Sequence, residues 1–409
     1  MTSKSTGTII KNQTGFNRAN FGGANFGRSS LEAWCLDPDR YHLNHGAYGA
    51  LTKSTFAHMC ELGQEIEAAP ANFIRKSFRT RLRNQIDNFA DYVGANADDL
   101  VFVENATAGC NAVLRSLVLT PGDEIVISTL AYPSVRQVAQ FVAHRAHAHI
   151  VEARITPYMA EPSQLLDSIL DSFTARTRLV IIDHITSLSA QLMPVHEIAE
   201  LCRERGIDLL IDGAHAPGQI DLQIQEIGCS WYVGNGHKWF GAPRGIAFIW
   251  TAPNYQELMR PTVITKTLDE GYMGAFDWPG SRNFSSWLSL SHVRAERERL
   301  GGETLMRRYA SELVGEAALM LARRLGGRCH HSPGLAMAII CLPRQSYDPA
   351  EAARIRAWLA DEYAIDVAIF VVEGECILRI SAWIYNEMQD YHHLGDVLAK
   401  LGRKGLRAK

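Results

Sequence analysis

One lysine, one acid and one histidine of the sequence are spaced in a way that suits covalent chemistry. Asp212 ends an apolar run, and His215 follows three residues later. Lys238 lies in a Gly-rich stretch and directly precedes Trp239 and Phe240. Bulky aromatic neighbours desolvate a lysine amine, which lowers its pKa and makes it nucleophilic. The alternative for Lys238 alone is a side chain that lies along apolar surface with its charge in water.

The combination of the three side chains fits a site for pyridoxal phosphate (PLP). Lys238 would form an imine with the aldehyde of this cofactor. Asp212 would keep the pyridine nitrogen protonated, so that the ring can accept electrons from a bound substrate. His215 would hydrogen-bond the phenolic oxygen or the imine region of the cofactor.

The segments that must position these residues alternate between strands and helices. The strands are apolar with little polar alternation, which indicates an α/β fold with a largely parallel sheet covered by helices on both faces. Ligand-binding groups of such sheets follow the carboxyl ends of strands, as Asp212 does. The predicted strands are 100–104, 124–128, 179–183, 209–212, 231–233 and 245–250, and the predicted helices are 107–117, 135–144 and 195–205.

The length of 409 residues predicts two unequal domains, because single cores rarely grow beyond ~250–300 residues. We expect an N-terminal arm over 1–35, a large PLP-binding domain over 36–295 and a small C-terminal α+β domain over 296–409. The arm has too few core residues to fold alone, so it is either flexible or ordered by packing on the body. In the small domain we predict helices over 292–300, 303–325 and 348–363 and strands over 336–342, 365–371 and 376–381.

Composition argues against several classes of protein. The chain has 41 Lys and Arg against 44 Asp and Glu, whereas nucleic-acid-binding proteins usually have a basic excess. We find no apolar run of the ~18 residues that a membrane span needs, and no secretory signal. The eight cysteines form no CxxC pair, and several lie in apolar runs. This pattern predicts reduced thiols and a cytoplasmic protein.

Seven motifs occur in an order that is specific even though each motif alone is not. They are YHLNHGAYGA (41–50), LVFVENATAGCNAVLRSL (100–117), DHITS (183–187), DGAHAPG (212–218), GNGHKW (234–239), FDWPGSRN (276–283) and LRISAWIYN (378–386). Together they resemble the class V aminotransferases, PLP enzymes of fold type I, and most of all the isopenicillin N epimerase branch. The resemblance covers roughly residues 35 to 390 and implies a large PLP-binding domain with a smaller C-terminal domain.

The resemblance also implies which residues hold the cofactor phosphate. Ala106 and Thr107 open a helix after a strand, where backbone N–H groups and the threonine hydroxyl would bind it. An ordinary helix cap is the compatible alternative. Asn235 matches a further phosphate contact, and His237 lies beside it in the cofactor-binding motif. Ser281 matches a residue, more often Thr in the family, that reaches across a dimer interface, which implies a homodimer.

The remaining implied contacts are with the cofactor ring and the substrate. Tyr132 matches the ring-stacking aromatic, unless it is a core tyrosine in a turn. Thr186 would lie beside the cofactor. Arg379 lies within an apolar strand, where a cation is costly unless it is paired. Its planar fork would bind the substrate carboxylate, with a structural salt bridge as the alternative. Asn44 and His45 would line the same pocket.

Several other patterns lead to no site. The run 22–29 approximates a phosphate-binding loop, but Arg28 stands where lysine belongs and no strand precedes it. The histidine and cysteine clusters lack zinc-site spacing, so we predict no metal centre. Cysteine desulfurases carry a nucleophilic cysteine shortly before the carboxylate-binding arginine, and 351–370 contains none. A persulfide-forming desulfurase is therefore not expected.

The functional hypothesis is a PLP-dependent enzyme that acts at the α-carbon of an amino acid. The isopenicillin N epimerase branch has varied activities in specialised, antibiotic-type metabolism. Among these, our first interpretation is β-elimination of a cysteine S-conjugate. Epimerisation of an isopenicillin N-type amino acid, decarboxylation-coupled deamination and transamination stay open, because none of them has a readable motif. A catalytically silent subunit is opposed by the presence of both Lys238 and Asp212.

Overall fold

The central element of the protein is a seven-stranded, mostly parallel sheet, seen in the computed structural model, which describes residues 16–159, 161–343 and 348–404. Its strand order is β2-β8-β7-β6-β5-β3-β4, and only β8 runs antiparallel to its neighbours. The α/β prediction is therefore confirmed. The strands are β2 (Leu100–Val103), β3 (Glu124–Ser128), β4 (His149–Ala153), β5 (Thr177–Asp183), β6 (Asp208–Asp212), β7 (Trp231–Asn235) and β8 (Ala247–Thr251).

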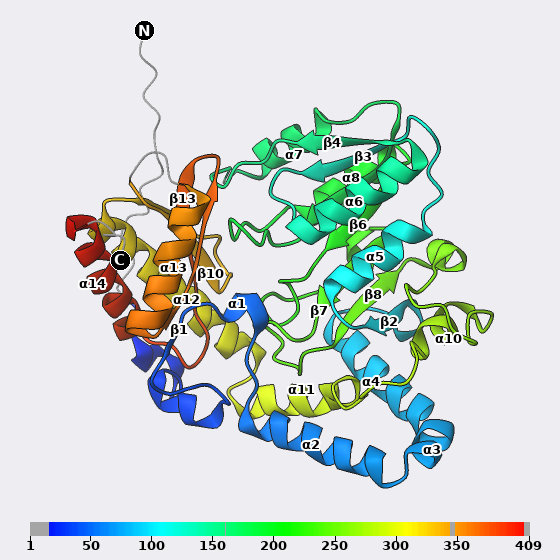
Figure 1. Ribbon diagram of the computed structural model, residues 1–409, viewed down its shortest axis with the longest axis horizontal. Coiled ribbons are helices and arrows are strands. Elements are labelled where there is room, and N and C mark those ends of the chain that lie inside the picture. Colours follow the sequence, from blue (N-terminus) through cyan, green and yellow to red (C-terminus); the bar gives the residue numbers. More distant parts are fainter. Residues whose placement is uncertain (1–15, 160, 344–347, 405–409) are drawn as a thin grey trace.

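Both faces of this sheet are covered, which explains why its strands are apolar throughout. Alternate strand residues belong to different cores: Leu210 lies in one core, whereas Leu209 and Ile211 lie in the other. The first face packs against α5 (Ala106–Ser116), α6 (Pro133–Ala146) and α10 (Gly271–Asp277). The second face packs against α4 (Phe78–Tyr92), α7 (Pro162–Leu170), α8 (Val195–Glu204) and α9 (Ile224–Ile227). Figure 1 labels α4, α5, α6, α7, α8 and α10 around the green and cyan strands.

The C-terminal part forms a second, antiparallel sheet with the strand order β12-β13-β10-β9. The predicted strand 365–371 is divided, because Ile365–Asp366 leaves this sheet and pairs elsewhere as β11. The strands are β9 (Arg328–His330), β10 (Met337–Cys341), β12 (Ala368–Val372) and β13 (Glu375–Ser381). The helices are α12 (Glu303–Leu325), α13 (Pro349–Tyr363) and α14 (Met388–Lys404).

The first described residues pack against this C-terminal part (Figure 1). Residues 1–15 of the predicted arm lie outside the described ranges. Phe21 and Phe26 are buried, with ring centroids 5.1 and 4.8 Å from that of Tyr309 in α12. The elements here are η1 (Arg18–Phe21), η2 (Arg28–Ala33), β1 (Tyr41–His42), which pairs in parallel with β11, and α1 (His45–Tyr48). The boundaries at 36 and 296 stay a proposal.

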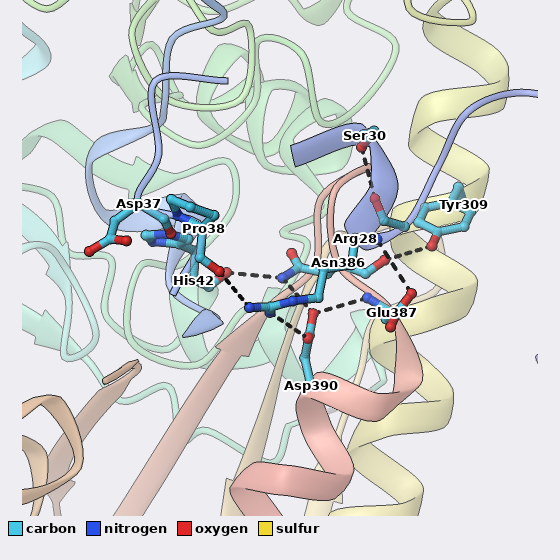
Figure 2. Close-up of polar contacts among 10 residues, drawn as sticks. Arg28, Ser30, Asp37, Pro38, His42, Tyr309, Asn386, Glu387 and Asp390 are labelled. Carbon is cyan, nitrogen blue, oxygen red and sulfur yellow. Dashed lines mark hydrogen bonds and ion pairs between the residues drawn. The ribbon is translucent and has the colours of Figure 1, made fainter. Parts of the chain in front are cut away.

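A polar cluster, which we term the N-terminal clasp, ties this segment to α14 (Figure 2). It comprises Arg28, Pro38, His42, Asn386 and Asp390. The guanidinium of Arg28 donates to Asp390 Oδ1 at 3.2 Å and to the Pro38 carbonyl at 2.7 Å. Asn386 Nδ2 donates to the His42 carbonyl at 3.2 Å. The clasp thus fixes the chain just before α1, and it gives Arg28 a structural role.

The remaining elements connect these parts. The long helices α2 and α11 pack against each other along one side of the molecule (Figure 1). No helix in the described ranges is long and apolar enough to cross a membrane. The elements are α2 (Lys53–Ala68), α3 (Pro70–Asn72), η3 (Phe73–Ser77), η4 (Ala97–Asp99), η5 (Pro253–Leu258), η6 (Trp287–Ser289) and α11 (Leu290–Arg299).

Candidate active site

A cavity of about 290 Å³ opens where the central sheet meets α1 and β13. It lies at the carboxyl ends of β5, β6 and β7, as expected for a site in an open α/β sheet. Its wall comprises Gly46, Ala47, Tyr48, Asn105, Ala106, Thr107, Tyr132, Asp183, Ile185, Ser187, Asp212, Ala214, His215, Asn235, His237, Lys238 and Arg379. Most of the residues proposed from the sequence therefore share one cavity.

Backbone packing from two sides holds the loop that carries Lys238. On one side, Gly49 follows α1 with a φ of 65° and leaves no room for a Cβ against the His237 carbonyl. On the other side, Gly218 has a φ of 87°, and a Cβ there would lie 2.4 Å from the Trp239 carbonyl carbon. The glycines of the motifs 41–50 and 212–218 thus let two chain segments approach the lysine loop closely.

Arg297 of α11 fixes the same loop through its carbonyl groups. Its guanidinium donates to the carbonyls of Trp239 at 2.7 Å, Phe240 at 3.0 Å and Gly218 at 3.2 Å. Arg297 is buried and forms an ion pair with Glu303. A buried guanidinium with all these acceptors is well satisfied. It ties α11 to the backbone that follows Lys238.

Lys238 reaches the cavity next to His215. Lys238 Nζ lies 3.0 Å from His215 Nε2, and Trp239 Nε1 donates to His215 Nδ1 at 3.2 Å. The pKa of Lys238 is lowered to about 8, chiefly by burial; the Arg379 cation also lowers it, whereas Asp212 and Asp183 raise it. Burial holds the pKa of His215 well below its usual value. His215 is therefore neutral near physiological pH, and the neutral amine of Lys238 is much more accessible than that of an ordinary lysine.

Two acids lie side by side at the base of the cavity. Asp212 ends β6, and its register partner on β5 is Asp183. Burial raises the pKa of Asp212, although the Ala214 N–H donates to its Oδ1 at 3.0 Å. Burial and the charge of Asp212 raise the pKa of Asp183 well above its usual value. The cavity floor is thus suited to a cationic ligand group that would relieve this repulsion.

Arg379 has hydrogen bonds but no carboxylate partner within the described residues. It donates to the Ser187 carbonyl and to Asn44 Oδ1, the latter at 3.0 Å, and its Nε is buried without an acceptor. Burial lowers its pKa to about 10. A buried cation without a counter-ion is destabilising for the fold. It is what a site for an anionic ligand requires, so the salt-bridge alternative is wrong.

The N-terminus of α5 points its first residues at the cavity. Asn235 Oδ1 accepts a hydrogen bond from the Ala106 N–H at 2.9 Å, and Asn105 Oδ1 caps the helix at Ala108. Asn235 therefore braces the start of α5. The Thr107 side chain forms no hydrogen bond with another described residue and lines the cavity. A helix start with such groups favours an anion such as phosphate.

Comparisons with known proteins identify the family to which this chain belongs. The family model "Aminotransferase class-V" matches residues 67–272, about half of the chain. The chain belongs to the class V aminotransferase family. It is a PLP-dependent enzyme.

Individual relatives of this class V chain have more than one activity. It is 29% identical to an isopenicillin N epimerase of Streptomyces clavuligerus, over 90% of this chain and 96% of that protein. It is 28% identical to an L-cysteine desulfhydrase of Arabidopsis thaliana, over 88% of this chain and 87% of that protein. A solved cystine C–S lyase in complex with cysteine persulfide has the same fold, with a TM-score of 0.74, 20% identity and coverage of 88% and 97% of the two chains.

The residues of the class V cavity fit PLP. Burial raises the pKa of both Asp212 and Asp183, and a protonated pyridine nitrogen would supply a charge that offsets this. The α5 N-terminus offers groups for the phosphate, and Lys238 offers the amine for the aldehyde. The volume is near the lower end of the ~300–1,000 Å³ of ligand pockets. The individual cofactor contacts remain proposals.

Four residues proposed from the sequence lie outside the cavity wall. Thr186 is buried, and its hydroxyl bonds Ser189 and the Gln191 N–H, so it braces a turn. Asn44 acts through Arg379 rather than lining the cavity. His45 lies behind the wall. Ser281 is exposed, and its proposed role across a dimer interface stays a prediction.

His45 contributes to the packing around the cavity. Its ring stacks on Trp383 at 4.9 Å and its Nδ1 lies 2.9 Å from the Tyr385 hydroxyl. Burial lowers its pKa to about 3. It therefore supports α1 as a neutral ring, and no direct contact with a ligand follows from its position.

In the segment 183–187, the residues that line the cavity are not the one predicted from the sequence. Asp183, Ile185 and Ser187 line the cavity, whereas Thr186, the candidate from the sequence, and its neighbour His184 are not part of the wall. His184 Nδ1 instead lies 2.8 Å from the Tyr232 hydroxyl. Extended chains alternate their side chains between faces, and Asp183 is level with Asp212. This alternation in the sequence could have identified Asp183 and Ser187 as cavity-lining residues.

Proposed function

We propose that the enzyme cleaves the C–S bond of a cysteine S-conjugate by β-elimination. The observation that carries this proposal is the presence of a buried amine of lowered pKa, Lys238, and a buried guanidinium without a counter-ion, Arg379, on one cavity wall. The first group can remove a proton from Cα, and the second can bind the α-carboxylate of the amino acid.

Each residue has a defined role in this proposal. Arg379 orients the substrate, with its fork held by Asn44 and Ser187. Lys238 takes the Cα proton, and bound PLP supplies the electron sink that stabilises the negative charge left at Cα. The thiolate then leaves Cβ with the C–S electron pair and takes up a proton. The other product, 2-aminoacrylate, consumes one water to give pyruvate and ammonia.

The absence of a nucleophilic thiol favours elimination over persulfide formation. Within the described residues, the cavity wall contains no cysteine. Cys341 and Cys376 are buried in the small sheet. The names of the similar L-cysteine desulfhydrase and cystine C–S lyase are consistent with elimination at a cysteine substrate. The specialised-metabolism setting and a cytoplasmic location are parts of the same proposal, as is a homodimer completed by Ser281.

The test is a product analysis with purified, PLP-loaded protein. L-cysteine, L-cystine and a series of S-alkyl cysteines are incubated with the enzyme, and pyruvate, ammonia and free thiol are quantified. We expect the three products in equal amounts from at least one substrate and none from Lys238→Ala. Equimolar sulfane sulfur and alanine without pyruvate would contradict the proposal.

Epimerisation is the second candidate, because the isopenicillin N epimerase is 29% identical along almost the whole chain. An epimerase exchanges the Cα proton with solvent and inverts the centre without losing the side chain. The same incubations in deuterium oxide distinguish the two reactions. Deuterium at Cα and a mixture of enantiomers, without thiol release, would favour the epimerase.

A further inference from the structure

Trp239, His215 and Lys238 form a row of side chains whose hydrogen bonds have only one consistent direction. The indole N–H of Trp239 is a donor with no acceptor capacity. It points at His215 Nδ1 at 3.2 Å, so this nitrogen carries no proton and accepts. A neutral imidazole has one donor and one acceptor, so the ring proton lies on Nε2. That proton points at Lys238 Nζ, 3.0 Å away.

The direction of this row determines the state of the lysine. An ammonium group has three donors and no acceptor, so a protonated Lys238 would face the Nε2 proton of His215. A neutral amine has a lone pair that accepts this proton. We propose that Trp239 is a positioning residue that, through the tautomer of His215, favours the neutral amine of Lys238 over its ammonium form.

The surrounding contacts hold both ends of the row. Trp239 is fully buried, and its carbonyl is held by Arg297 at 2.7 Å. A Cβ at position 46 would lie 2.7 Å from Trp239 Cζ2, so Gly46 permits close packing of α1 on the indole. At His215, the backbone carbonyl accepts from Gln219 Nε2 at 2.7 Å. These contacts keep the Trp239 indole in place as the donor and His215 Nδ1 as the acceptor.

The charges around the row act in the same direction. Burial keeps the pKa of His215 well below its usual value, and the Arg379 cation lowers it further. A doubly protonated ring is thus disfavoured. Asp212 and Asp183 act oppositely, because their charges favour an ammonium at Lys238. The hydrogen bond from His215 counters these two acids and favours the nucleophilic form of the amine.

The catalytic consequence rests on the proposed function, but the hydrogen-bond direction does not. A neutral Lys238 can attack an aldehyde without first losing a proton. In the elimination proposed above, the lysine must again be neutral when it accepts the Cα proton. The row therefore concerns the acid–base state of one amine, whichever bond of the substrate is broken.

The first test reads the tautomer directly. Full-length protein labelled with ¹⁵N-histidine and freed of cofactor is studied by solid-state NMR, with the His215 signals identified by their loss in His215→Gln. We expect one bare nitrogen, Nδ1, and one protonated nitrogen, Nε2, at pH 7.5. A proton on Nδ1, or protons on both nitrogens, would overturn the proposal.

The second test measures the lysine. The rate of acetylation of Lys238 is followed against pH by mass spectrometry, which gives its pKa. In Trp239→Phe, His215 Nδ1 can take the proton, Nε2 can accept from an ammonium, and the pKa of Lys238 should rise by about one unit. The neutral fraction at pH 7 would then fall roughly tenfold. Unchanged titration of Lys238 in this variant would refute the proposal.

Trp231→Phe is the matched control. Trp231 is equally buried in β7, but its Nε1 has no acceptor among the described residues. Its replacement should leave the titration of Lys238 unchanged. If Trp239→Phe does not fold, the tautomer in the wild-type protein decides alone. The expected tautomer together with an absence of thiol release would contradict only the proposed function.

Discussion

A Cβ atom at position 49 would stand 1.9 Å from the backbone carbonyl oxygen of His237. No real Cβ contact is this short, and the obstacle is backbone rather than a flexible side chain. Gly49 also has a φ of 65°, which strains any other residue. The residue after α1 and the residue before Lys238 are therefore coupled directly, although 188 positions separate them in the sequence.

Gly49→Ala should displace the lysine loop. We expect a loss of about 2 kcal/mol or more in the free energy of unfolding and weaker PLP capture, measured by urea titration and visible absorbance. Gly63→Ala in α2 is the control, since no atom lies within 4 Å of a Cβ there. It should be stabilising by up to about 1 kcal/mol. Equal behaviour of the two variants would show that the close approach is unimportant.

Arg379→Met should separate binding from folding. Loss of charged hydrogen bonds to a substrate carboxylate is expected to lower kcat/KM about 100-fold or more, mainly through KM. The free energy of unfolding should not fall by more than about 1 kcal/mol, because a buried cation without a counter-ion disappears. Exposed Arg244→Met controls for net charge. An unstable variant with unchanged KM would assign Arg379 a structural role instead.

His184 should make the fold sensitive to acid. Burial lowers its pKa to about 3, so below pH ~6.5 the unfolded chain binds a proton that the native ring refuses. Its contribution to stability is thus complete above pH ~6.5 and falls by about 1.4 kcal/mol per pH unit below it. Urea unfolding of His184→Gln at pH 7.5, 6 and 5 should show a shrinking difference from the wild type. His149→Gln, at an exposed position of β4, serves as the control for the removal of a histidine.

Arg28→Ala should loosen the N-terminal clasp. Asp390 is buried and would lose its cation, at a cost of about 1–3 kcal/mol. Hydrogen exchange of η2 and β1 should increase, because these elements depend on the clasp to stay on α14. Arg18→Ala is the matched control, as this arginine is exposed and donates to Ser29 at 3.2 Å. Faster exchange in the control alone would contradict the assignment.

The parts of the site that follow strands could be predicted from the sequence. Asp212, His215 and Lys238 lie after β6 and β7, and neighbouring parallel strands bring their carboxyl ends together without knowledge of distant contacts. Arg379 could be identified because burying a cation in an apolar strand is costly unless a partner or ligand compensates for it. Lone, fully buried charges are uncommon in proteins, so a charged residue in an apolar strand has few possible roles, and ligand binding is one of them.

The parts that depend on distant packing could not be predicted. Arg297 lies in the strongly charged helix α11, whose sequence suggests a solvated helix, and nothing local indicates that it turns towards the lysine loop. The pairing of β1 with β11 involves two residues on each side. Such a short pair has no pattern of its own. The direction of the Trp239–His215 hydrogen bond likewise needs three-dimensional coordinates.

The clasp has a consequence for biosynthesis. Arg28 and Asp390 are 362 positions apart, so one partner emerges from the ribosome long before the other has been translated. The nascent chain can assemble its central sheet early, but α1 cannot receive its final support until α14 has been made. Because Arg379 of β13 lines the cavity, the cavity wall itself is also incomplete until that strand has been made.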